Sequence, residues 1–299
     1  MLTSNRTAAG WGRKKKEDPR LTGRQPAAAA SRPISVTADT TGTTPATFPY
    51  GPLREDQARF CPHCYRDGPT TTCAVQAHWP QVRRRHPIYL SGVHCAATDA
   101  LEAAGADIGL ILQPGSHLHP AAPRYRYWAA DNGCFAGGAN FDAYRWFEWL
   151  CGLPDVTVRR RCLFATGPDV LCDAAATWDR SAPWLPLIRA AGVPAAIVGQ
   201  NGVEDHGPTW DNDHLWDVMF IGGDTDWKCS NEARDVAQEA QMRGKWLHVG
   251  RVNSWRRLDL VADWDVDSVD GTLLRFGPEV NGRRLAQWLR RLDTAPTLF

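Results

Sequence analysis

The sequence has no long apolar run. No stretch approaches the roughly 18 apolar residues that a membrane-spanning helix requires. The alanine run Ala27–Ala30 is too short to be the apolar region of a secretory signal. The cysteines number nine, and an odd total argues against a framework of paired disulfides. We therefore expect a soluble protein in a reducing cytoplasm, with no membrane partner.

An excess of charge of one sign is also missing. The 34 Lys and Arg residues almost balance the 33 Asp and Glu residues, and the net charge is +1. The chain as a whole is therefore not a general binder of polyanions. Its basic residues form clusters, which either neutralise phosphates or make a solvated face. These clusters are Arg13–Lys16, Arg83–Arg85, Arg159–Arg161 and Arg256–Arg257.

Residues 1–55 lack a sustained apolar period. They are rich in Ala, Thr, Pro, Gly and Arg, a composition that cannot bury enough apolar surface to fold. We expect a disordered basic tail over 1–55, a metal-binding segment over 56–86 and a folded domain over 87–299.

The segment after the tail has the spacing of a zinc site. Cys61 and Cys64 flank a tight turn, and Cys73 and His78 complete the pattern C-x2-C-x8-C-x4-H. Four protein ligands fill a tetrahedral zinc site and leave no open position, so the predicted Zn²⁺ is structural. His63 is an alternative fourth ligand. The competing interpretation is a set of unrelated free cysteines.

The folded part alternates short apolar runs with amphipathic segments. Polar residues follow these runs at intervals of about 42, 27, 22, 26 and 22 residues, close to the length of one strand-loop-helix-loop unit. These polar residues are Asp131, Asp173, Gln200, Gly222 with Gly223, His248 and Asp270. The predicted strands are 88–91, 108–112, 127–130, 162–165, 195–199, 218–221, 246–249 and 266–269.

Eight strands with helices between them favour a (β/α)8 TIM barrel, whose chemistry lies at the C-terminal ends of the strands. Amphipathic segments such as 96–104, 141–150, 183–190 and 233–242 supply the helices. The fourth strand has an ambiguous end, because Gly167-Pro168 can break it and Val170–Cys172 can extend it. A doubly wound open sheet is the alternative fold.

Five motifs in this order resemble the tRNA-guanine transglycosylases. They are DNGCF at Asp131–Phe135, Asp173, Gln200 after AAIV, the pair Gly222-Gly223, and DSVD at Asp267–Asp270. The strings PDVLCDAAAT, FIGGDTDWK and HVGRVNSWRR look like the DNA-acting relatives of bacteria and phages, which insert 7-deazaguanines into DNA. The resemblance covers about 87–288. The chain departs from the tRNA enzymes in having no C-terminal cysteine-rich zinc insertion.

Base exchange at a glycosidic carbon needs a nucleophile and a proton donor, and two carboxylates on facing strands supply both. The resemblance implies that Asp270 is the nucleophile, which forms a covalent glycosyl-aspartate. It also implies that Asp131 is the general acid and base. Asp267 is a rival nucleophile three residues earlier.

A guanine-type base presents two neighbouring donors and one acceptor, so its pocket needs a carboxylate and N–H groups. Asp173 fits the carboxylate role, the Gly223 backbone N–H fits the acceptor, and the Gln200 amide suits both. Asp173 is also a plausible helix N-cap, and the glycine pair a plain turn. The same motifs add further candidate binding residues, namely Gly222, Asn132, His248 and Arg251.

These residues predict a DNA-guanine transglycosylase that inserts a 7-deazaguanine such as preQ0 into DNA, duplex or locally unpaired. It would act in the host cytoplasm if a phage encodes it. The target base must leave the stack, and Trp227 and Trp255 are candidates to pack against it. The alternatives are a tRNA substrate, a barrel hydrolase of nucleosides or glycosides, and a non-catalytic zinc-knuckle protein that binds nucleic acid.

Overall fold

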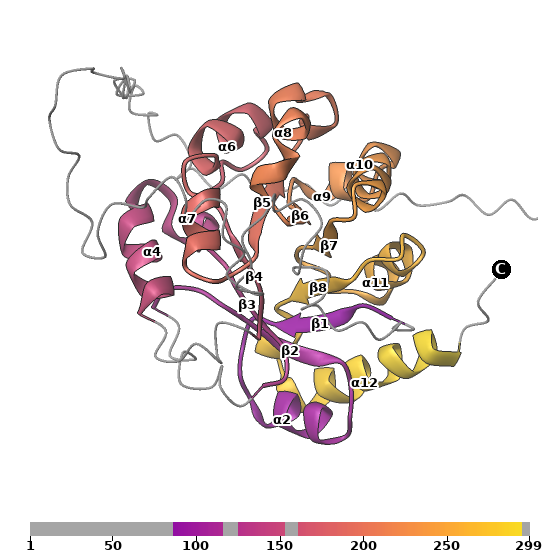
Figure 1. The fold of residues 1–299 in the computed structure, drawn as a ribbon. Coiled ribbons are helices and arrows are strands. Elements are labelled where there is room, and N and C mark those ends of the chain that lie inside the picture. Colours follow the sequence, from indigo (N-terminus) through magenta and orange to yellow (C-terminus); the bar gives the residue numbers. More distant parts are fainter. Residues whose placement is uncertain (1–85, 116–124, 153–160, 295–299) are drawn as a thin grey trace, which may run out of the picture. The chain divides into compact units, whose positions relative to one another are not determined.

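The computed structural model describes residues 86–115, 125–152 and 161–294. Eight parallel strands close into a barrel in the order β1 to β8, and β8 pairs with β1. Figure 1 shows the strands at the centre and the helices around them. The closed barrel confirms the predicted (β/α)8 architecture and excludes the open sheet.

The strands are short and almost wholly buried, as expected for parallel strands that are covered on both faces. Their bounds are β1 Ile88–Ser91, β2 Ile108–Leu112, β3 Trp128–Ala130, β4 Cys162–Thr166, β5 Ala195–Gly199, β6 Val218–Ile221, β7 Trp246–Val249 and β8 Ser268–Gly271.

Two strand ends differ from the prediction in ways that affect the site. Strand β4 ends at Thr166, so Gly167-Pro168 breaks it and the extension through Val170–Cys172 does not form. Strand β8 begins two residues later than predicted, which places Asp270 inside the strand instead of after it. The backbone of Asp270 pairs with that of Leu90 on β1.

Successive side chains on a strand alternate between the barrel interior and the helices. One apolar cluster fills the interior with alternate residues such as Ile88 and Leu90 of β1. Phe220 and His248 continue this inner column, with ring centroids 4.4 Å apart. Asp270 has the same parity as Ser268, the residue whose backbone pairs with His248. The alternation therefore directs His248 and Asp270 inward.

The longer helices cover the outside of the barrel. They are α2 Ala96–Ala103, α4 Ala143–Cys151, α6 Ala174–Ser181, α7 Leu185–Ala190, α10 Asn231–Met242, α11 Trp255–Ala262 and α12 Pro278–Thr294. Shorter α-helices are α3 Cys134–Gly137, α8 Gly207–Asp211 and α9 Thr225–Lys228. Four 3-10 turns are η4 Gly138–Asn140, η5 Val203–Asp205, η6 Asp213–Leu215 and η7 Leu273–Arg275.

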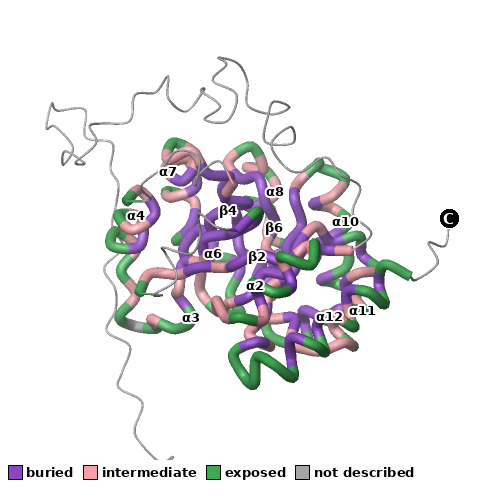
Figure 2. Tube along the Cα trace, turned by 90° about the horizontal axis from the view of Figure 1, so that it is seen from below, coloured by how far each residue is buried: buried purple, intermediate pink, exposed green. Residues whose placement is uncertain are grey.

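Helix α10 shows why these segments are helical and where they pack. Its N-cap Ser230 accepts a hydrogen bond from the Ala233 N–H, one of the donors that a helix start leaves without a partner. Its buried residues Ala233, Val236, Ala237 and Ala240 form one stripe at helical spacing. Figure 2 shows the resulting pattern, with buried residues on strands and inner helix faces and exposed residues outside.

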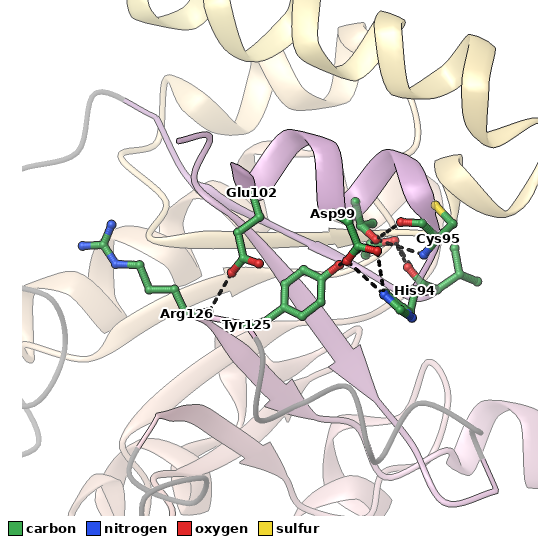
Figure 3. Close-up of polar contacts among 9 residues, drawn as sticks. His94, Cys95, Asp99, Glu102, Tyr125 and Arg126 are labelled. Atoms are coloured by element: carbon green, nitrogen blue, oxygen red, sulfur yellow. Dashed lines mark hydrogen bonds and ion pairs between the residues drawn. The ribbon is translucent and has the colours of Figure 1, made fainter. Parts of the chain in front are cut away.

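A polar cluster ties α2 to the segment that enters β3 (Figure 3). The buried Tyr125 hydroxyl lies 2.8 Å from both Thr98 Oγ1 and Asp99 Oδ1. His94 Nε2 lies 2.9 Å from the same Asp99 oxygen. The Arg126 N–H donates to Glu102 at 2.8 Å. Burial raises the Tyr125 pKa, which keeps the hydroxyl protonated as a donor, so we assign the cluster a structural role.

The described residues all belong to the second of the chain's two units, Leu53–Phe299. The predicted tail over 1–55 and nearly all of the segment over 56–86 lie outside the described residues. Across the described ranges, no helix is long and apolar enough to span a membrane.

Candidate active site

A cavity of about 470 Å³ opens at the C-terminal ends of the strands. This volume is within the roughly 300–1,000 Å³ of small-molecule pockets. Every strand end contributes to its wall. The predicted site residues that line it are Asp131, Asn132, Gln200, Gly222, Gly223, Arg251 and Asp270. Asp173 and His248 are absent from the lining.

Asp270 presents one carboxylate oxygen to the protein and the other to the cavity. Its Oδ1 accepts a hydrogen bond from His248 Nε2 at 3.1 Å and another from the Arg251 backbone N–H at 3.2 Å. No hydrogen bond from a described residue reaches Oδ2. The side chain is 13% exposed. The carboxylate is therefore held at one oxygen and free to react at the other.

His248 bonds to Asp270 from the barrel interior and does not line the cavity. Its ring is fully buried between Phe164 and Phe220. The indole of Trp246 can only donate, so Ser268 Oγ accepts from it at 2.8 Å. The Ser268 hydroxyl then donates to His248 Nδ1 at 2.8 Å, and Nε2 carries the ring proton toward Asp270. Burial lowers the His248 pKa, which fits this neutral tautomer.

Ser268, His248 and Asp270 have the residue types of a hydrolytic triad but not its geometry. A nucleophilic serine must face its substrate and give its proton to the histidine during attack. Ser268 is fully buried inside the barrel and has no access to the cavity. The chain of bonds therefore positions the Asp270 carboxylate, and the carboxylate is the group that faces the cavity.

Asp131 follows β3 directly and faces the same cavity. Burial raises its pKa to about 7, and the charges of Asp270 and then Asp169 add to the rise. Backbone hydrogen bonds from Gly133 and Asn132 oppose it. A carboxyl group with this pKa holds and releases a proton near neutral pH, as a general acid and base must.

The carboxylate nearest the predicted base pocket is Asp169, not Asp173. Asp173 is exposed and caps helix α6 by accepting from the Ala176 N–H at 2.9 Å. The helix-cap interpretation of Asp173 therefore agrees with the structure, and the pocket interpretation does not. Asp169 lies three residues after β4 and lines the cavity. Burial raises its pKa.

Gln200 organises the wall that Asp169 belongs to. Its Oε1 accepts from the backbone N–H groups of Cys172 and Gly223, each at 2.9 Å. Its Nε2 donates to Asp169 Oδ2 at 2.7 Å. The Gly223 N–H, which we expected to face a bound base, is thus directed to Gln200. The second N–H of Gln200 Nε2 has no acceptor among the described residues.

Asn132 acts on Asp169 and has no spare donor for a ligand. Its Nδ2 donates to the Gly167 carbonyl at 2.6 Å and to Asp169 Oδ1 at 3.0 Å. Its Oδ1 accepts from the Cys134 N–H at 2.7 Å. With both N–H bonds occupied, Asn132 fixes the loop after β4.

Arg251 lies between Asp270 and the cavity wall that contains Gly223. Its guanidinium donates to the Gly223 carbonyl at 2.8 Å and lies over the Phe135 ring at 5.1 Å. Its backbone has a φ of 58°, which is costly for a residue with a side chain. A Cβ on the preceding Gly250 would lie 2.6 Å from a Phe220 ring carbon, so only glycine fits there.

Asp267, the rival nucleophile, is directed away from the cavity. Its Oδ2 accepts from the Leu247 N–H at 2.8 Å, and its backbone carbonyl accepts from the Ile88 N–H at 3.0 Å. It lies just before β8, at the opposite end of the strand from the cavity. This position favours Asp270.

The exposed aromatic residue at the cavity rim is not a tryptophan. Trp227 is 9% exposed and its indole N–H meets Glu204 Oε2 at 3.2 Å. Trp255 packs against Trp288. Phe135, by contrast, lines the cavity and is 71% exposed. Leu171, 50% exposed, lies with it on the rim.

Asp169 and Lys228 are functional candidates that the predicted site lacks. Asp169 lies in the string PDVLCD, four residues before Asp173. Which of the two lines the cavity depends on where β4 ends, and the sequence left that end ambiguous. Lys228 lies at the end of α9, where a lysine normally reaches solvent. It is 5% exposed and lines the cavity. No sequence signal distinguishes it from a surface lysine.

The predicted zinc ligands Cys61, Cys64, Cys73 and His78 lie outside the described residues. Within the described ranges, no group of three or more His, Cys, Asp or Glu side chains is arranged to hold a metal ion. The zinc site stays a prediction.

The fold and cavity define a (β/α)8 barrel with paired carboxylates at its C-terminal mouth. No family model matches the chain, and no curated protein matches it. Among solved structures, the chain is similar to the crystal structure of a putative lyase/mutase from Burkholderia cenocepacia J2315, at 14% identity and a TM-score of 0.34. The match covers 81% of this chain and 98% of that chain. Such a distant likeness says nothing about activity.

Proposed function

We propose that this barrel is a transglycosylase that exchanges guanine in DNA for a 7-deazaguanine base such as preQ0. The observation that carries the proposal is the pair Asp131 and Asp270 at one cavity. One has a pKa of about 7 and the other has a free oxygen whose partner oxygen is held by two donors. An acid and a nucleophile at one carbon are what base exchange requires.

In the first half of the reaction, Asp270 Oδ2 attacks the anomeric carbon C1′. The bond from C1′ to N9 of guanine breaks, and its electron pair moves to the base. Asp131 gives its proton to the departing guanine and becomes ionised. The product is a covalent deoxyribosyl-aspartate.

In the second half, the ionised Asp131 takes the N9 proton of the incoming base. N9 then attacks C1′, and the electron pair of the bond between C1′ and Asp270 returns to the carboxylate. Two displacements at one carbon retain the β configuration.

Asp169 and Gln200 fit the edge of a guanine-type base. Asp169 accepts hydrogen bonds from the Asn132 and Gln200 amides and from the Cys134 thiol, and its carboxylate is the acceptor on the cavity wall that suits N1–H and N2–H. The spare N–H of Gln200 lies next to Asp169 and suits O6. In this proposal Asp169 takes the recognition role that we expected for Asp173.

The rim supports a nucleotide substrate that has left its stack. Phe135 and Leu171 offer exposed apolar surface beside the cavity, which suits stacking on a displaced base or its neighbour. Arg251 and Arg275 also line the cavity and suit backbone phosphates. DNA is preferred to tRNA because of the resemblance of the motif strings to the DNA-acting enzymes.

The test is a covalent adduct and base exchange. Full-length protein should form a denaturation-resistant adduct with guanine-containing DNA and exchange labelled guanine or preQ0 into it. Asp270→Asn should abolish both while the melting temperature is retained, because the amide keeps the shape and loses the nucleophilicity. Asp267→Asn is the matched control and should behave as wild type.

Other outcomes would select other functions. Exchange into tRNA alone would move the substrate to RNA. Release of free guanine without base insertion would identify a hydrolase. Neither adduct nor exchange with DNA, tRNA or nucleosides would refute the transglycosylase.

A further inference from the structure

Lys228 is a buried lysine without a use in the reaction described above. It ends α9 and is 5% exposed at the cavity wall. Within the described residues, no carboxylate oxygen lies within ion-pairing distance of its Nζ. Nζ donates instead to the Gly250 carbonyl at 2.8 Å. Burying an ammonium group beside a backbone carbonyl, with no carboxylate to pair with it, costs free energy of folding. Such a residue therefore calls for an explanation.

The Gly250 carbonyl and the Arg251 N–H belong to one planar peptide unit. The N–H of this unit is one of the two donors to Asp270 Oδ1, at 3.2 Å. In a trans peptide the carbonyl and the N–H point in opposite directions, so anchoring the oxygen aims the N–H. The anchor matters here because Arg251 has a left-handed φ of 58°, which is costly for a residue with a side chain.

Burial and the neighbouring charges, including that of Asp270, set the pKa of Lys228. Burial lowers its pKa to about 8, and Arg251 and Arg257 add to the lowering. The negative charge of Asp270 opposes this lowering. Lys228 is thus protonated at neutral pH and close to the nucleophile.

We propose that Lys228 is a positioning residue for Asp270, which acts by clamping the Gly250–Arg251 peptide so that its N–H holds the nucleophile's Oδ1. The assignment rests on the proposed function for its kinetic consequence, but not for its geometry. It gives the nucleophile two independent supports, one through the His248 side chain and one through a backbone N–H.

The kinetic test compares Lys228→Met and Lys228→Arg with wild type, using guanine-containing DNA. Lys228→Met keeps the aliphatic stem and removes the donor, so the rate of adduct formation at saturating DNA should fall roughly ten- to a hundredfold. Lys228→Arg retains a charged donor and should recover most of the rate. The dissociation constant for DNA, measured in the Asp270→Asn background where no adduct forms, should not change on adding Lys228→Met.

Lys245 provides a matched control at the other end of the same strand. Lys245 directly precedes β7, and Gly250 directly follows this strand. The Lys245 Nζ donates to the carbonyls of Asp213 and Trp216 at 2.6 and 3.0 Å. Lys245→Met should lower the melting temperature and leave the adduct rate of the folded protein unchanged.

A structural test is independent of activity. In a crystal structure of full-length Lys228→Met, the Gly250–Arg251 peptide should rotate, and the Arg251 N–H should leave Asp270 Oδ1. An unchanged peptide would overturn the proposal even if the variant were slow. A weakened DNA affinity with an unchanged adduct rate would also overturn it, by making Lys228 a phosphate contact.

The two proposals fail separately. If wild type forms no adduct with any nucleic acid, the transglycosylase assignment fails, and the crystal structure of Lys228→Met still decides whether Lys228 clamps the peptide.

Discussion

Asp131 and Asp270 face one cavity from different surroundings. Burial raises the pKa of Asp131 to about 7, and the neighbouring carboxylates Asp270 and Asp169 add to the rise. Asp270 has an imidazole N–H and a backbone N–H on one oxygen. Environment, not residue type, therefore distinguishes the two carboxyl groups, and it suits them to the proposed roles of proton carrier and nucleophile.

The raised pKa of Asp131 predicts a stability cost at alkaline pH. Because the folded pKa of about 7 lies above the ordinary Asp value, this group favours folding below its ordinary pKa and loses that contribution as pH rises through about 7. Asp131→Asn should therefore raise the melting temperature more at pH 8 than at pH 5. The gain is limited to about 1.4 kcal/mol for each pH unit between the two pKa values.

The same substitution should slow adduct formation by roughly 10² to 10⁴, the usual contribution of a general acid. Thermal unfolding at the two pH values and adduct kinetics measure both effects. An equal stability gain at both pH values would contradict the raised pKa.

Asp169 and Asp173 form a matched pair for base recognition. Asp169→Asn replaces an acceptor with an amide at the cavity wall, so use of guanine and preQ0 should fall by about two orders of magnitude. Asp173→Asn should leave base use and stability unchanged, because Asn caps helices as well as Asp. Asp173→Ala should cost about 1 kcal/mol of stability alone. Incorporation assays with guanine, preQ0 and adenine, alongside melting temperatures, measure these outcomes.

At the residue scale, strand-end position identified the wall of the cavity but not each side chain's partner. Gln200 and Gly223 lie where the motifs placed them, yet they bond to each other. Asp169 and Asp173 are the same residue type in one short string, and only the backbone path after β4 leaves Asp173 exposed and Asp169 partly buried at the cavity wall. Hydrogen-bond partners of this kind depend on loop geometry, which a local pattern does not encode.

At the element scale, β7 and β8 carry the residues that support the Asp270 carboxylate. His248 and Ser268 lie opposite each other in this pair, and the chain from Trp246 through Ser268 to His248 ends on Asp270. Apolar runs located both strands, but the run before Asp270 suggested a start at Val266, two residues early. Apolar residues continue past a strand's hydrogen-bonded part, so composition alone cannot fix such an end.

Ser268→Ala tests this support. It leaves His248 Nδ1 without its partner in a fully buried position, which should cost about 1–3 kcal/mol of stability. It should also slow adduct formation roughly tenfold, because His248 no longer has a fixed tautomer and orientation.

Thr209→Ala is the control, because Thr209 is also buried and its hydroxyl lies 2.9 Å from His206 Nδ1, away from the cavity. It should lower stability alone. Equal adduct rates for the two variants would contradict a positioning role for Ser268.

At the scale of the whole molecule, the barrel was predictable because eight apolar runs at regular spacing have few closed arrangements. The burial of Lys228 was not predictable, because it arises only when α9 packs against the end of β7. Sequence patterns record which residues face inward along one element. They do not record contacts between two elements.

The zinc prediction also concerns the whole chain. Full-length protein should contain about one zinc per chain, and Cys61→Ser should lose it together with stability, because metal binding and folding are coupled. Cys229→Ser, at an exposed free cysteine, should retain the metal. Elemental analysis of active protein without zinc would refute the site.

The position of Asp270 inside β8, while Asp169, Gln200 and Gly223 lie beyond strand ends, has a consequence for how this protein can diversify. Loops accept substitutions and insertions that strands of a closed barrel do not. Under the proposed function, the choice of base can therefore change through substitutions after β4, β5 and β6, while the residue that attacks the sugar is constrained by the packing of the barrel. Under the proposed function, relatives with this arrangement should differ first in which base they insert and last in how they bind it to deoxyribose.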